Sequence, residues 1–183
     1  MSKANELERQ RAHAGDTYVE YMREAIEQSK AFREEYELRL NVVKHSDMPF
    51  ERSPDGLIKH IIHENMNTKE CCIEMYMQFL DPGKATGKHR HLSEEIAFVV
   101  EGEGHDLHWD VMFDCKDEFE WEWKKEPKKF EWKRGDFIYI PPYCTHQRVN
   151  TGAEEARIVV CNNKIIKDMG FDWFEQIENA EGF

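Results

Sequence analysis

The feature that most constrains the fold is a period of two in hydrophobicity, repeated in short segments after residue 49. Over residues 73–79 and again over 107–113, apolar and polar side chains alternate, as they do in strands with one buried face. Turn residues at 81–83 (Asp-Pro-Gly) and 141–142 (Pro-Pro) separate such segments. Many short strands with turns between them predict an all-β sandwich or barrel over residues 49–168.

The two ends of the chain have a different pattern. Residues 1–48 are charged, and apolar side chains recur at helical spacing over 17–43, which predicts an N-terminal helical extension with one long amphipathic helix. We expect its apolar stripe to pack on the barrel or on a second subunit. Residues 169–183 are expected to form a C-terminal helical tail, because Asp172 can cap a helix there. That helix would contain Trp173, Phe174 and Ile177.

The composition argues against several classes of protein. Lys and Arg number 25 and Asp and Glu number 37 in 183 residues, so the net charge is −12. This acidic balance argues against nucleic acid and anionic membranes as partners. No apolar run approaches the ~20 residues of a membrane span, and the first residues lack a signal-peptide core, so we expect a cytoplasmic protein. The five cysteines contain no C-x-x-C pair, which argues against a disulfide framework or a zinc ribbon.

Residues that could bind a metal ion lie in two segments of the sequence. His89 and His91 are two apart, so on a strand both point to the same face and can reach one ion. Glu95 can add a carboxylate oxygen, and His146 can supply a third imidazole from a neighbouring strand. A lone H-x-H is weak evidence by itself, because exposed or ordinarily hydrogen-bonded histidines have the same spacing.

The two segments together resemble the cupin family, whose motifs are G-x5-H-x-H-x3-4-E-x6-G and G-x5-P-x-G-x2-H-x3-N. The first segment runs from His89 to Gly102 with the H-x-H, E and G spacing intact. The second runs from Gly135 to Asn150 and keeps Pro141 and His146. Tyr143 stands where the family has glycine, which we expect to reshape the turn and to leave the ligand spacing unchanged.

This resemblance implies a cupin double-stranded β-helix, a jelly-roll barrel. It also implies that one divalent metal ion is bound, Fe(II) being favoured and Mn(II), Ni(II) or Zn(II) possible. Three nitrogens and one oxygen leave two positions of an octahedron open, which is typical of catalytic metal sites. The ligands implied by the resemblance are His89, His91, Glu95 and His146.

A closer likeness concerns gentisate-type ring-cleaving dioxygenases. The stretches 89–91, 98–104 and 135–137 look like the cupin core of those enzymes. They are longer two-cupin chains with a three-histidine site, whereas this chain has Glu95. The likeness therefore supports the site geometry more than it supports gentisate as the substrate.

Three further residues are candidate catalytic groups. Arg148 lies two beyond His146 and should point into the barrel, either as an anchor for a substrate carboxylate or as part of an internal salt bridge. Glu101 or His105 would move a proton in a reaction without redox chemistry.

The favoured function is an Fe(II)-type dioxygenase, an oxidoreductase that acts on a small phenolic or carboxylated substrate. The alternatives are a non-redox isomerase, decarboxylase or lyase, and a cupin that binds a small ligand without turnover. We expect a homodimer, for which the helical extension and a tryptophan-rich hairpin at 114–133 offer surfaces.

Overall fold

The computed structural model describes residues 17–69, 72–115, 117, 119–171 and 173–183. The chain divides into two compact units, Met1–Leu40 and Asn41–Phe183. In the first unit, helix α2 (Thr17–Leu38) confirms the expected helix but ends before residue 43. Its last turn tightens, because the Arg39 amide donates to the Tyr36 carbonyl at 3.1 Å.

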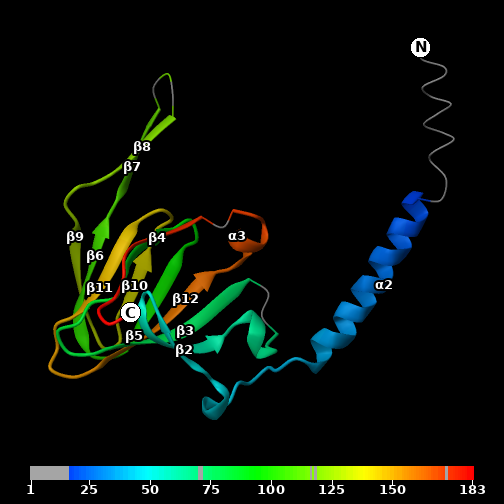
Figure 1. Cartoon of the computed structure of the whole chain (residues 1–183), viewed down its shortest axis with the longest axis horizontal. Coiled ribbons are helices and arrows are strands. Elements are labelled where there is room, and N and C mark those ends of the chain that lie inside the picture. The colour runs from blue at the N-terminus through cyan, green and yellow to red at the C-terminus, as the bar shows by residue number, and fades with distance from the viewer. Residues whose placement is uncertain (1–16, 70–71, 116, 118, 172) are drawn as a thin grey trace. The chain divides into compact units, whose positions relative to one another are not determined.

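The second unit is built from antiparallel strands in two facing sheets (Figure 1). The first sheet has the order β1 (Phe50–Ser53), β2 (Gly56–Ile62), β3 (Ile73–Leu80), β12 (Ala156–Asn163), β5 (Glu95–Glu101), β10 (Phe137–Ile140). The second has the order β13 (Phe174–Glu178), β4 (Lys88–His91), β11 (Thr145–Asn150), β6 (Glu103–Trp109), β9 (Lys128–Lys133). The short 3-10 helices η1 (His45–Asp47) and η2 (Glu64–Met66) lie in connections. The expected barrel architecture is thus present.

Alternation along the strands sets which side chains face the inside of the barrel. In β5, Glu95, Ala97 and Val99 are buried, whereas the residues between them are more exposed. The same period of two therefore builds the core and turns one carboxylate inward. The buried apolar core consists of Leu80, Ala97, Val99, Trp132, Ile138, Ile140, Cys144, Ala156, Ile158 and Val160.

The tryptophan-rich hairpin differs from the expected one. Strand β7 (Val111–Cys115) pairs with β8 (Phe119–Trp123) in a separate two-stranded sheet, which projects from the barrel in Figure 1. Strand β9 instead returns to the barrel and pairs with β6. The reason is Trp132, which is buried and donates its indole N–H to Asp106 of β6 at 2.8 Å.

The C-terminal segment also differs from expectation. A short helix is present, but α3 spans Ile165–Asp168, earlier than the expected tail. Residues Phe174–Glu178 form strand β13, which adds an edge to β4 by pairing Phe174 with His91 and Glu175 with Arg90. Tertiary pairing overrides the local helical pattern here. The expected cap Asp172 lies outside the described residues.

None of the described helices is both long enough and apolar enough to cross a bilayer.

Candidate metal centre

Three strands bring the predicted ligands together. Strand β4 turns His89 and His91 inward, β5 begins with Glu95, and β11 places His146 opposite His89 in the register. All four side chains are buried, and one ligand atom from each lies within 4.8 Å of the others. The spacing along two separate segments thus becomes a single cluster of three imidazoles and one carboxylate.

Several polar atoms in this cluster have no hydrogen-bond partner. These atoms, all of them buried, are Nε2 of His91, Nε2 of His146 and Oε2 of Glu95. Oε2 of Glu95 lies 3.6 Å from Nε2 of His91 and 3.9 Å from Nε2 of His146. Unpaired buried polar atoms are costly, and one divalent cation would satisfy these three at once. The cluster therefore fits a metal ion.

The backbone fixes which ring nitrogen faces the cluster. Nδ1 of His91 lies 2.7 Å from the carbonyl oxygen of Ser93, and Nδ1 of His146 lies 3.1 Å from that of Cys144. A carbonyl only accepts, so each Nδ1 carries the proton and donates it. Each Nε2 then presents a lone pair to the cluster, which is the tautomer that a metal ligand needs.

His89 has a carboxylate neighbour that the sequence did not reveal. Oδ1 of Asp55, in the turn between β1 and β2, lies 3.2 Å from Nδ1 of His89. Gln78 donates to the other oxygen of Asp55 and holds it in place. Burial alone lowers the pKa of His89, but the charge of Asp55 outweighs it, and the net pKa is raised. Neither Oδ1 of Asp55 nor Nδ1 of His89 has a hydrogen-bond partner, so Asp55 acts on His89 through its charge at 3.2 Å, and in that way it is placed to orient the ring.

Replacing Asp55 by asparagine is expected to weaken metal binding by about 10- to 100-fold, because the charged partner of His89 is lost. Competition with a chromogenic chelator measures the affinity. The matched control is Asp81→Asn, which changes an exposed turn aspartate. Equal affinities of Asp55→Asn and the unmodified protein would contradict the orienting role.

Glu95 is held by a buried arginine. Nη2 of Arg148 lies 3.1 Å from Oε1 of Glu95, which leaves Oε2 toward the histidines. Arg148 also donates to Asp106 through Nε and Nη2 at 3.2 Å, and to Gln78 through Nη1 at 2.9 Å. Burial alone would raise the pKa of Glu95, but His91, His146 and Arg148 outweigh it and hold the pKa well below its usual range.

This geometry corresponds to the internal salt bridge rather than to the substrate anchor. Arg148 is only 3% exposed, and its guanidinium is occupied by protein acceptors. Arg148 is therefore a positioning residue for Glu95 in this structure.

The two proposed proton-transfer residues lie away from the cluster. Glu101 follows Glu95, Ala97 and Val99 at a spacing of two along β5, but it is exposed at the end of the strand, with Oε2 3.3 Å from Arg157. His105 faces the other side of β6 from the buried Asp106 and His108. The histidine of β6 that points inward is therefore His108. Alternation along the strand predicts only that His105 and His108 lie on opposite faces, not which of them points inward.

Comparison with known proteins decides the family. A family model described as auxin binding protein matches residues 37–177. The chain belongs to this auxin-binding-protein family. Over 117 residues it is 29% identical to an uncharacterized protein of Methanocaldococcus jannaschii, a match that covers 62% of this chain and 78% of that protein.

Solved structures support the cupin fold of this family member. An oxalate decarboxylase of Bacillus subtilis matches 68% of the chain at 16% identity, with a TM-score of 0.51. The capsular polysaccharide assembling protein CapF of Staphylococcus aureus matches 71% at 16% identity, with a TM-score of 0.50. The chain spans about a third of each, 31% and 34% respectively. The likeness to gentisate-type dioxygenases stays a prediction.

The departure from the cupin motif at Tyr143 leaves the turn intact. Tyr143 has a φ of 62°, the left-handed conformation that glycine adopts readily. Its amide donates to the carbonyl of His91 at 2.8 Å, and its carbonyl accepts from the indole of Trp123 at 2.8 Å. Its ring packs edge-on against Trp121, with centroids 4.6 Å apart. Aromatic packing thus offsets the backbone strain, and the spacing to His146 is kept.

The strain at Tyr143 gives a stability prediction. Tyr143→Gly is expected to be more stable than Tyr143→Ala by about 1 kcal/mol, since both lose the ring but only glycine relaxes at positive φ. At Tyr139, inside strand β10, the order should reverse, because glycine weakens a strand interior. Urea unfolding of the four variants measures both differences. If Tyr143→Ala were as stable as Tyr143→Gly or more stable, the φ of Tyr143 would store no strain.

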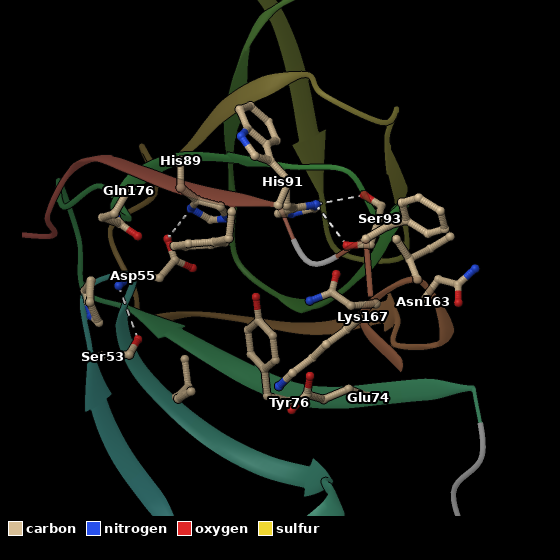
Figure 2. A pocket seen from close by; sticks show the side chains of 17 residues that line it. Ser53, Asp55, Glu74, Tyr76, His89, His91, Ser93, Asn163, Lys167 and Gln176 are labelled. Atoms are coloured by element: carbon tan, nitrogen blue, oxygen red, sulfur yellow. Dashed lines mark hydrogen bonds and ion pairs between the residues drawn. The ribbon is translucent and has the colours of Figure 1, made fainter. Parts of the chain in front are cut away.

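A pocket of ≈ 490 Å³ opens beside the metal cluster and is bordered by His89 and His91 (Figure 2). Its polar side chains include Tyr76 of β3, Asp55 of the turn between β1 and β2, and Lys167 of α3. Neither Arg148, Glu101 nor His105 lines it. Its apolar walls are formed by Pro54, Ile58, Ile166, Phe171, Trp173 and Phe174.

Proposed function

We propose that this chain is a metal-dependent cupin enzyme, an Fe(II)-type dioxygenase that acts on a small phenolic or carboxylated substrate. The observation that carries this proposal is a buried four-ligand cluster that borders a pocket of ≈ 490 Å³. A purely structural metal site is closed and needs no such pocket. The partly aromatic wall and the volume suit a single-ring compound.

The residues of the chain would perform distinct tasks. An iron ion held by the four ligands would supply a Lewis acid with open positions and one-electron chemistry toward dioxygen. Arg148 keeps Glu95 ionised and orients it, while Asp55 orients His89. Phe171 and Trp173 form part of the apolar wall, which would hold a ring and exclude water.

The non-redox alternative needs a proton-transfer group in the pocket. Glu101 and His105, which were candidates for that task, do not line it. The pocket is lined by other groups that could move a proton, Glu74, Tyr76 and Lys167. We rank an isomerase, decarboxylase or lyase second because the two residues predicted for its proton transfer lie elsewhere.

The proposal is tested by metal analysis of protein purified without added metal, followed by oxygen-electrode measurements with a panel of phenolic and carboxylic acids. Oxygen uptake that depends on iron and disappears in His146→Ala would support it. Stoichiometric zinc with no oxygen uptake across the panel would contradict it and favour non-redox chemistry. Ligand binding without turnover would favour a binding protein.

A further inference from the structure

Tyr76 and Asn162 meet in the pocket beside the metal cluster. Tyr76 belongs to β3 and Asn162 to the adjacent strand β12, where Asn162 lies opposite Glu95 in the register with β5. Both residues line the pocket. In Figure 2 the hydroxyl of Tyr76 points into the pocket, toward the side that carries His89 and His91.

The two side chains lie on the same face of the sheet. In the register of β12 with β3, Val160 is opposite Tyr76 and Asn162 is opposite Glu74, so Asn162 is the diagonal neighbour of Tyr76. The amide oxygen Oδ1 of Asn162 is buried and has no partner. An unsatisfied buried acceptor in a pocket wall is costly unless a ligand or a water molecule donates to it.

Tyr76 is kept in its protonated form. Burial raises its pKa well above the usual value, and the negative charges of Glu95 and Asp55 raise it further. The hydroxyl points into the pocket, so its proton can be donated to a ligand there. The pair therefore offers one donor, the hydroxyl of Tyr76, next to one acceptor, Oδ1 of Asn162.

We propose that Tyr76 and Asn162 form a subsite that recognises a hydroxyl group of the ligand, with Tyr76 donating to the hydroxyl oxygen and Asn162 Oδ1 accepting its proton. A carboxylate would not fit as well, because it only accepts and would leave Oδ1 of Asn162 unpaired. With the apolar wall of Phe171 and Trp173, the subsite selects a phenol or another small hydroxylated ring. This inference deepens the proposed function and rests on it for the identity of the reaction, though not for binding.

The test uses phenol and toluene, which differ by a hydroxyl in place of a methyl group of similar size. Dissociation constants are measured by NMR titration on metal-free and on zinc-loaded protein. We expect the preference for phenol over toluene to fall by about tenfold in Tyr76→Phe, which is the effect of one hydrogen bond. Asn162→Ala should reduce the preference as well, because the acceptor is lost.

Tyr139→Phe is the matched control, since Tyr139 is exposed and its hydroxyl donates to Glu94 outside the pocket. Its preference should equal that of the unmodified protein. An unchanged preference in Tyr76→Phe, an equal change in Tyr139→Phe, or no binding of phenol to the unmodified protein would each overturn the subsite.

The binding test uses zinc-loaded and metal-free protein, which are expected to consume no oxygen. Its outcome therefore does not depend on the proposed dioxygenase activity, and either proposal can fail without the other. Intact phenol discrimination without any oxygen uptake by the iron form would contradict the dioxygenase and leave the subsite standing. Oxygen uptake that is insensitive to Tyr76→Phe in KM and in kcat, with no phenol preference, would contradict the subsite alone.

Discussion

Replacing His146 by alanine is expected to abolish stoichiometric metal binding. His146 supplies one of four ligand atoms that lie within 4.8 Å of one another, and the other three come from two strands that it faces. Losing one ligand removes both a metal–nitrogen bond and the closure of the site. A metal that binds only the folded state also stabilises it, by about 4 kcal/mol at a free concentration 1,000 times the dissociation constant.

Two measurements check this prediction on the same samples. Elemental analysis should give one metal ion per chain for the unmodified protein and a small fraction of that for His146→Ala. Thermal unfolding with added metal should show a rise in Tm that the variant lacks. His105→Ala is the control, because His105 lies on the outward side of β6, away from the cluster. A variant at position 146 that keeps a full equivalent of metal would rule out this ligand set.

Metal removal should likewise lower the Tm of the unmodified protein while leaving the apparent Tm of His146→Ala unchanged. Comparing the two metal-free proteins separates binding from folding. Because Nε2 of His146 is buried without a hydrogen-bond partner, the alanine variant does not lose a satisfied polar contact at that atom. A large deficit of the metal-free variant would therefore have to come from the lost packing and from the lost hydrogen bond between Nδ1 and the Cys144 carbonyl.

The ligand set could be predicted from the sequence because strand geometry is local. A period of two fixes that His89 and His91 share a face, and the motif spacing fixes that Glu95 and His146 follow at strand starts. Pairing of β4 with β11 then needs only the barrel topology that the resemblance supplied. Alternation within one strand therefore predicts the shared face of His89 and His91, whereas the grouping with Glu95 and His146 follows from the cupin resemblance.

The features that the sequence did not predict depend on contacts between distant segments. Asp55 sits in an ordinary turn, and its position next to His89 appears only when β2 and β4 fold into facing sheets. Strand β13 has an amphipathic pattern compatible with a helix and becomes a strand because β4 offers an open edge. The partner of Arg148 follows from the register that pairs it with Asp106 on β6.

Replacing Arg148 by methionine is expected to destabilise the metal-free protein by about 3–5 kcal/mol, the usual cost of leaving buried charges unpaired. Glu95 and Asp106 would both lose their cationic partner, and both are at most 1% exposed. Urea unfolding in the presence of a chelator measures the difference without a contribution from bound metal. Arg157→Met is the control, because Arg157 pairs with Glu101 and Glu155 at the exposed surface and should change stability by less than about 1 kcal/mol.

The stability deficit of Arg148→Met is also expected to depend on pH. In the unmodified protein the pKa of Glu95 is lowered, so its contribution to stability is present above the ordinary pKa of a glutamate and is lost as the pH falls. In Arg148→Met the contribution of the arginine is lost while those of His91 and His146 remain, so the pKa of Glu95 is lowered less and Glu95 contributes less stability. The deficit of the variant should therefore be larger above the ordinary pKa of a glutamate than well below it. Adding Glu95→Gln should recover part of it at neutral pH, because one of the two unpaired charges is removed. A deficit that is independent of pH and unaffected by Glu95→Gln would mean that Arg148 stabilises the barrel by packing alone, and that Glu95 needs no cation to remain ionised.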